Sequence, residues 1–170
     1  MISVTQADTD PDLDAVRDLV RAFVRWAMTE IAKDNNPAVF DGLEKELAAL
    51  PGRYGPPGGG LLLARLDGSP AGCVAFFDRG GGIMEIKRMF VTPKARGHGI
   101  GGRMLERLLA DARASGHRRG LLWTHKTMLA AQAIYRRAGF REVPLSDEFV
   151  GAAAGIDVCM EMDLQGETAA

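Results

Sequence analysis

The sequence predicts a single α/β domain: a mixed, mostly antiparallel sheet of about seven strands, with about four helices on its two faces. A length of 170 residues, with 46% hydrophobic and 25% charged residues, is typical of one globular domain. Asp67-Gly68-Ser69-Pro70 lies between two apolar runs, which is a hairpin signature. Further along, strand and helix patterns alternate, as in β-α-β crossovers that place helices on both faces of a sheet. We expect the domain to span residues 1–165, and residues 166–170 to be a frayed tail.

The first sixty residues predict an edge strand, two helices and a loop. The short strand is expected at 2–6. Asp10-Pro11 suits the cap and first position of a helix, whose apolar residues recur at helical spacing to about residue 33. A second helix is expected over 37–50. The stretch 51–60, PGRYGPPGGG, contains three prolines and five glycines, and this composition excludes regular structure there.

The rest of the chain predicts six strands and two helices. Leucines at helical spacing predict a helix over 101–115 that stops at Gly116, and a second helix over 127–138 ends at Gly139. Apolar runs bounded by turn residues predict strands at 61–66, 71–78, 83–91, 120–124, 140–143 and 156–164.

Charge is distributed unevenly along the chain. The formal net charge is -1, but residues 87–141 contain 13 basic and 2 acidic groups, whereas residues 142–170 contain 7 acidic groups and no basic ones. Such a basic segment attracts an anion. The sequence pI of about 6.3 is unlike that of a nucleic-acid-binding domain, and a small polyphosphate ligand fits the pattern equally well. The alternative is that the basic helices simply pair with the acidic ends of the chain.

The compartment and metal content are predicted from a few residues. Cys73 and Cys159 both lie in apolar runs, which excludes a disulfide scaffold and suits a reducing compartment. No apolar run approaches the roughly 18 residues of a membrane span, and the acidic N-terminus is unlike a secretory signal. We therefore expect a cytoplasmic protein. The three histidines and two cysteines have no metal-ligand spacing, so no metal site is expected.

The most informative segment is the glycine-rich connection after the strand that ends at Val91. Gly97, Gly99, Gly101 and Gly102 enter a helix there. A helix N-terminus has unpaired N–H groups and the positive end of the helix dipole, and glycines let a phosphate approach those amides. The segment therefore predicts a phosphate-binding loop. The alternative is a flexible loop in which the glycines serve only as turns.

Two nucleotide motifs are excluded by context. Residues 97–102 match G-x-G-x-x-G, but the dinucleotide fingerprint follows the first strand and has an acidic residue about 20 positions on. Residues 119–126, RGLLWTHK, contain no acid, and no Gly-Lys-Ser/Thr of a P-loop is present. A nucleotide-binding α/β domain remains the weaker alternative.

Two separated motifs resemble the GNAT superfamily of acyl-CoA-dependent N-acyltransferases. The first is Arg96-Gly-His-Gly-Ile-Gly101 after the strand EIKRMFV, and the second is AQAIYRRAGF at 131–140. The resemblance implies an N-acetyltransferase that moves an acetyl group from acetyl-CoA to a primary amine of a small molecule or peptide. It also implies a sheet splayed between the strands 83–91 and 120–124, and it is compatible with a homodimer. A non-catalytic acyl-CoA-binding sensor is the alternative.

The resemblance also implies which residues bind the coenzyme. The exposed backbone of Met89, Phe90 and Val91 would pair with the pantetheine amides, like a short extra strand. The pyrophosphate would be held by the glycine loop and the start of its helix, namely Arg96, Gly97, His98, Gly99, Ile100, Gly101 and Gly102.

Tyr135 and Glu85 are the candidate catalytic residues. The resemblance places Tyr135 at the coenzyme sulfur as general acid. A phenol with a pKa of about 10 is roughly 2 kcal/mol too weak an acid to protonate a thiolate fully, so a hydrogen bond to the developing thiolate is more plausible. The alternative for Tyr135 is packing at the sheet edge. Glu85 would be a general base, would bind the acceptor, or would form a structural ion pair with Lys87 on the same strand face.

Two further positions bear on the site. Many members of the superfamily have an Asn seven residues before the tyrosine that contacts pantetheine, whereas this chain has Met128. That departure makes the contacts in this segment uncertain. His125 follows the strand 120–124 and would either face the cleft, where it could assist acid–base chemistry, or lie at the surface.

Overall fold

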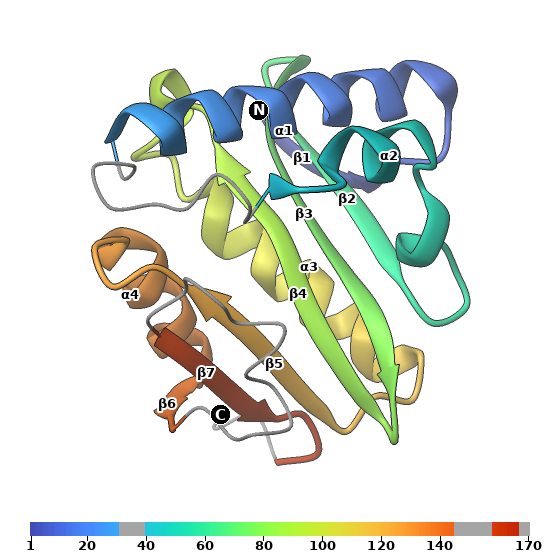
Figure 1. Cartoon of the computed structure of the whole chain (residues 1–170), viewed down its shortest axis with the longest axis vertical. Helices are drawn as coiled ribbons and strands as arrows, with labels where there is room; N and C mark the ends of the chain where they lie inside the picture. The colour runs from blue at the N-terminus through green and yellow to red at the C-terminus, as the bar shows by residue number, and fades with distance from the viewer. Residues whose placement is uncertain (31–39, 145–157, 167–170) are drawn as a thin grey trace.

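The computed structural model describes residues 1–30, 40–144 and 158–166. The elements follow one another as a strand, two helices, three strands, a helix, a strand, a helix and two strands (Figure 1). Short 3-10 turns at Gly52–Tyr54 and Pro93–Ala95 complete the described part. The elements are β1 (Ile2–Gln6), α1 (Asp10–Glu30), α2 (Leu43–Ala48), β2 (Gly60–Leu66), β3 (Ser69–Gly80), β4 (Ile83–Val91), α3 (Ile100–Ala114), β5 (Arg119–Thr124), α4 (Leu129–Ala138), β6 (Arg141–Val143) and β7 (Val158–Asp163).

The strands form one seven-stranded sheet in the order β1-β2-β3-β4-β5-β7-β6. All neighbours are antiparallel except β4 and β5, which are parallel. The expected mixed, mostly antiparallel sheet is therefore confirmed. Asp67 (φ 49°) and Gly68 (φ 83°) form the two-residue turn between β2 and β3, and both have the positive φ that a tight hairpin turn requires.

The helices cover both faces of this sheet, as expected (Figure 1). α1 and α2 pack on one face, where residues such as Leu19, Leu47 and Leu63 form a buried cluster. α3 and α4 pack on the other, around residues such as Leu105 and Leu122. The two faces are thus separate apolar cores, and alternate residues of the central strands belong to one or the other.

The sheet opens between its two parallel strands. β4 pairs with β5 only at Ile83–Glu85, opposite Arg119–Leu121. Beyond Glu85 the two strands diverge (Figure 1). The splay that the resemblance implied is therefore present, and among the described residues no strand pairs with the last six residues of β4 on that side.

Several predicted boundaries need correction. The expected helix over 37–50 is described only as α2, six residues long, because Gly42 adopts a left-handed conformation (φ 80°) just before it. α1 is capped by Thr9, whose hydroxyl accepts a hydrogen bond from Asp12 N (3.4 Å), and not by Asp10. The loop 51–60 contains a 3-10 turn, contrary to the expectation of no regular structure. The ends expected at 31–33, 37–39, 156–157 and 167–170 lie outside the described residues.

None of the helices in the described ranges combines the length and the apolar composition that a membrane crossing requires.

Candidate active site

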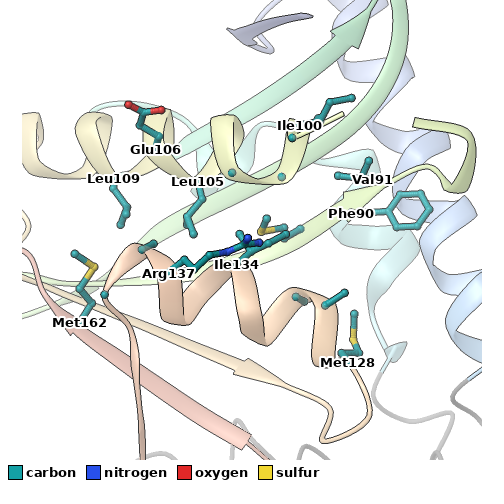
Figure 2. A pocket seen from close by; sticks show the side chains of 18 of the residues that line it. Phe90, Val91, Ile100, Leu105, Glu106, Leu109, Met128, Ile134, Arg137 and Met162 are labelled. Carbon is teal, nitrogen blue, oxygen red and sulfur yellow. The ribbon is translucent and has the colours of Figure 1, made fainter. Parts of the chain in front are cut away.

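A large cavity lies between α3 and α4, next to the opening between β4 and β5 (Figure 2). Its volume is about 1420 Å³, large enough for an extended cofactor. Val91 and Ile100 line it where β4 leads into α3, and Ile134 lines it from α4 (Figure 2). The cavity thus adjoins both segments that the sequence singled out, the glycine-rich connection and the fourth helix.

The glycine-rich loop forms an open cradle at one end of this cavity. Gly97 (φ 84°) and Gly99 (φ 76°) are left-handed, a conformation that favours glycine. The first intrahelical hydrogen bond of α3 runs from Arg103 N to Gly99 O (3.2 Å), so the helix does not use the three preceding amides. A Cβ atom at Gly97, Gly99 or Gly102 would meet nothing within 4 Å. These features fit a diphosphate bound by backbone N–H groups.

Gly101 has a different role from its neighbours. A Cβ atom there would lie 2.9 Å from Ile134 Cδ1 and 3.3 Å from Met89 Cε. The missing side chain therefore allows α3 to approach α4 and β4 closely.

One basic side chain lies at the cradle itself. Arg96 Nε donates a hydrogen bond to Val91 O (3.3 Å), and its guanidinium lies 4.9 Å from the centre of the Trp26 ring on α1. Arg113, Arg137 and Arg141 line the cavity farther from the cradle, and acidic side chains line it as well. Arg96 suits a phosphate bound at the cradle. Trp26 itself lines the cavity and contacts Arg96 across 70 residues.

His98 contributes differently from its neighbours. Its Nδ1 lies 3.2 Å from both Ala95 O and Arg96 O, so the ring contacts the carbonyls of its own loop. Its side chain is exposed and is not among the groups that line the cavity.

The edge of β4 forms one wall of the cavity. Met89, Phe90 and Val91 all line it, and β5 pairs only with the start of β4. On the other side β4 stays paired with β3, and Thr92 N donates to Ala71 O (2.9 Å). Among the described residues no strand covers this edge of β4, and one of its carbonyls, Val91 O, is bound by Arg96; such an edge suits a ligand with amide groups.

Tyr135 lies on α4 and is buried. Its ring packs edge-on against Phe140, with 6.0 Å between ring centres, and only 6% of the residue is exposed. Burial raises the pKa of Tyr135, so its hydroxyl keeps its proton at all physiological pH values. The residue belongs to the core beside the cavity and is not among the groups that line it. Its catalytic role stays a prediction.

Glu85 lies on β4 at the last residue pair with β5 and is 2% exposed. Its Oε2 accepts a hydrogen bond from Arg79 Nη1 (2.9 Å), and Lys87 Nζ lies 3.1 Å from Oε1 without hydrogen-bond geometry. The ion pair with Lys87 is therefore present, and Arg79 of β3 adds a second cation that sequence reasoning missed. Whether Glu85 also acts as a base stays a prediction.

The segment between β5 and α4 is held by a residue that the sequence did not single out. Gln132 Nε2 donates hydrogen bonds to His125 O and Lys126 O, both at 3.1 Å, from a buried position on α4. His125 Nδ1 lies 2.7 Å from Thr127 Oγ1, and its ring does not line the cavity. Met128 does line the cavity (Figure 2), so an apolar side chain stands where many superfamily members have Asn.

Across residues 1–30, 40–144 and 158–166, no three His, Cys, Asp or Glu side chains are grouped so that they could hold a metal ion.

The family-model comparison matches the segment that contains both motifs. Residues 18–140 match the acetyltransferase (GNAT) family. An uncharacterized N-acetyltransferase of Schizosaccharomyces pombe is 32% identical over 142 residues, which cover 82% of this chain and 83% of that protein. The IAA acetyltransferase of Azospirillum brasilense is 36% identical over 143 residues, which cover 84% and 87%.

Solved structures show the same fold. A GNAT-family acetyltransferase from Staphylococcus aureus superposes with a TM-score of 0.74 at 16% identity, covering 97% of this chain and all of that one (100%). An acetyltransferase from Salmonella typhimurium, solved with acetyl-CoA, superposes with a TM-score of 0.71 at 19% identity, covering 99% and 96%. Because family, relatives and fold agree, the chain belongs to the GNAT family and is an acyl-CoA-dependent N-acetyltransferase.

Proposed function

We propose that this enzyme acetylates a primary amine of a small molecule or peptide by direct attack on the thioester of acetyl-CoA. The observation that supports this proposal best is the combination, on one cavity, of an open glycine cradle with a β4 edge that no described strand covers. The cradle suits the diphosphate of coenzyme A, and the edge at Met89 and Val91 suits its pantetheine amides. The coenzyme supplies the activated acetyl group when it is bound.

The two candidate catalytic residues lie on opposite faces of the sheet. Tyr135 comes from α4, on the face of the cavity, and Glu85 belongs to the opposite side of β4, with Lys87. In the proposed reaction the amine nitrogen forms a bond to the acetyl carbon, and the carbon–sulfur bond breaks. Tyr135 donates a hydrogen bond to the departing sulfur. Glu85 accepts the proton that the amine loses; if Glu85 only binds the acceptor, that proton passes to solvent. In both cases the released thiolate takes up a proton from solvent.

Either role of Glu85 requires the acceptor to reach a buried carboxylate. Glu85 is 2% exposed, and Arg79 and Lys87 already contact its two oxygens. Its Oε1 accepts no hydrogen bond from the described residues, so a lone pair is available there for the proton of the acceptor or for its ammonium.

Two relatives have names that indicate their own substrates or products. One relative is the IAA acetyltransferase, and a second, 33% identical over 96 residues, is the N-acetylaspartate synthetase of Rattus norvegicus. The match to the latter covers 56% of this chain and 32% of that protein. We therefore propose only the chemical class, an amine nucleophile, for this chain.

The test is the release of free coenzyme A from acetyl-CoA across a panel of amines, amino acids and peptides. Coenzyme binding is followed in parallel by thermal shift. Turnover with one class of acceptor is the expected result and identifies the acceptor. Coenzyme binding with no turnover across the panel would favour an acyl-CoA sensor, and no thermal shift at all would contradict the coenzyme site.

The compartment and the oligomeric state are proposed on slighter grounds. Cys73 and Cys159 are free, buried thiols, which suits a reducing cytoplasm. A homodimer is proposed from the superfamily resemblance. Cell fractionation and light scattering of the purified protein test these two proposals separately.

A further inference from the structure

β4 contains a bulge just before the part that lines the cavity. Cys73 of β3 pairs with Phe90, and Ala75 pairs with Lys87, so two residues of β4 lie opposite the single Val74. One of the two is Arg88, whose φ of 58° is left-handed. A residue with a Cβ atom is disfavoured in this conformation, so other contacts have to hold Arg88 there.

A carboxylate from a distant helix provides that contact. Arg88 Nε donates to Oε1 of Glu46 on α2 at 2.8 Å, and both side chains are mostly buried (17% and 20% exposed). The Tyr54 hydroxyl donates to the same oxygen at 3.0 Å, and Arg53 Nη2 lies 3.2 Å from Oε2. Glu46 is therefore bound by three donors, of which only Arg88 belongs to the sheet.

The charge of this carboxylate persists at neutral pH. Burial alone would raise the pKa of Glu46, but the hydrogen bond and charge of Arg88, together with Tyr54 and Arg53, hold the pKa below its usual value. A charged, partly buried carboxylate forms stronger hydrogen bonds than a neutral one. The contact can therefore oppose the unfavourable backbone conformation of Arg88.

The bulge decides which side chains face the coenzyme cavity. Before it, Ile86 packs into the core on the α3 side, and Lys87 lies on the opposite face beside Glu85. After it, Met89 packs on the α3 side and lines the cavity, whereas the ring of Phe90 packs against α1, away from α4 (Figure 2). If the same residues ran through Arg88 in regular alternation, with no bulge, Met89 and Phe90 would exchange faces.

We propose that Glu46 is a positioning residue for coenzyme binding: through Arg88 it holds the β4 bulge that sets the cavity-facing edge of the strand. The inference rests on the coenzyme site proposed above. It connects α2, which lies on the other face of the sheet and does not line the cavity, to the affinity for coenzyme A.

The first test compares two variants that both lack the guanidinium. Arg88→Ala keeps a Cβ atom at a left-handed position without its ion pair, whereas Arg88→Gly adopts positive φ at no steric cost. Coenzyme A affinity is measured by calorimetry, without any acceptor. We expect Arg88→Ala to weaken binding about 10-fold and Arg88→Gly to weaken it less than about 3-fold. Equal losses in the two variants would overturn the proposal.

The second test removes the carboxylate. Glu46→Gln should weaken coenzyme A binding about 10-fold and raise KM for acetyl-CoA, with a smaller change in kcat. In an Arg88→Gly background the same change should have no further effect. Two results would show that Glu46 does not act through the bulge. One is a further loss of coenzyme A affinity when Glu46→Gln is added to Arg88→Gly, and the other is an unchanged affinity in Glu46→Gln alone.

Tyr54→Phe is the control for stability. It removes a hydrogen bond to the same carboxylate but leaves Arg88 in place. We expect a lower unfolding temperature and an unchanged affinity for coenzyme A; a weakened affinity would contradict the assignment to Arg88. Failure of the unmodified protein to bind coenzyme A would remove the site itself and is distinct from all these outcomes.

Discussion

The two faces of the sheet are built from different chemistry at the point where β4 and β5 part. On the α3 and α4 face, the part of the cavity at the glycine loop and β4 is bordered mainly by backbone amides, glycines and apolar side chains, and charged side chains border the rest. On the α1 and α2 face, the carboxylates of Glu46 and Glu85 are each bound by two basic side chains. One face is therefore suited to an unchanging ligand held by the backbone. The other depends on side chains, which can change while the fold remains.

This difference determines what the sequence reveals. The coenzyme face depends mainly on one continuous segment, residues 89–102, because backbone recognition needs glycines at fixed places. On the opposite face, the ion pair between Glu46 and Arg88 joins α2 to β4 across 42 residues, whereas Glu85 pairs with residues of β3 and β4 near it in sequence. The variants below perturb one face and leave the other intact.

The largest effect is expected from a negative charge in the phosphate cradle. Gly102→Glu places a carboxylate where a Cβ atom meets open space, so folding should be unaffected. Two unit charges 4 Å apart repel by about 4 kcal/mol in a partly exposed site. We expect coenzyme A binding to weaken at least about 100-fold, measured by calorimetry. Ala110→Glu, an exposed change on the same helix away from the cavity, is the matched control and should bind normally.

A smaller effect, on turnover alone, is expected at Tyr135. Tyr135→Phe removes the hydroxyl but keeps the packing against Phe140. If the hydroxyl stabilises the departing sulfur, kcat should fall about 100-fold while coenzyme A affinity stays within about 2-fold. Because burial raises the pKa of Tyr135, the unmodified enzyme should show no alkaline loss of kcat from this group below about pH 10. Unchanged turnover of the variant would reduce Tyr135 to a packing residue.

On the opposite face, Glu85→Gln should affect the acceptor and not the coenzyme. Arg79 and Lys87 lose their charged partner, so some loss of thermal stability is also expected. We expect kcat/KM for the acceptor to fall about 10-fold, with unchanged coenzyme A affinity. The pH profile of the variant separates the two roles of Glu85. If Glu85 is a base, the acidic limb of the kcat profile shifts in the variant. If Glu85 binds the acceptor, KM for the acceptor rises instead. A change in coenzyme A affinity would contradict the separation of the faces.

Acid should weaken the ion pairs around Glu46. Because its pKa is lowered in the folded state, this carboxylate contributes stability above its unfolded pKa, about 4.3, and that contribution is lost as pH falls through the lower folded pKa. Chemical unfolding between pH 7 and pH 3 should show a decline that Glu46→Gln reduces by of order 1 kcal/mol. An equal decline in both proteins would show that Glu46 does not contribute.

The smallest effect concerns the cysteines. Burial raises the pKa of Cys73 to about 12, and burial also raises the pKa of Cys159. The native protein should therefore show almost no reaction with a thiol reagent at pH 8, and two thiols should react after unfolding. Rapid labelling of the native protein would show that one cysteine is reachable. The expected result also means that a thiol assay reports coenzyme A release without a background from the enzyme.

The sequence predicted the fold wherever local pattern and tertiary structure agree. β4 was predicted with its observed bounds, because its apolar residues lie between Gly82 and the proline after it. The glycine loop and the end of α4 at Gly139 were likewise local signals. The second helix was predicted too long, because its apolar spacing gave no sign that Gly42 would be left-handed.

The site was predictable only in part, for the same reason. The backbone contacts at residues 89–102 follow from one stretch of sequence, and so does the Lys87 partner of Glu85, whereas Glu46 as the partner of Arg88 and Arg79 as the second partner of Glu85 depend on which elements become neighbours. The bulge at Arg88 was also hidden, because a left-handed arginine has no sequence signature comparable to that of glycine. Gln132 escaped notice because its two hydrogen bonds go to backbone carbonyls.

The short junction between β4 and β5 also has a consequence for native-state hydrogen exchange. In the described part of the chain, only three residue pairs join the strands β1–β4 to the strands β5–β7. The backbone link between the two groups is short, although one apolar core, which includes Met84, Leu122 and Met160, spans both of them. We expect the amides of the second group to exchange faster than those of the first. Coenzyme A would contact both groups, through β4 and α3 on one side and α4 on the other. Coenzyme A binding should therefore slow amide exchange in β5–β7 more than in β1–β3, because the ligand contacts both groups of strands and stabilises them against separation.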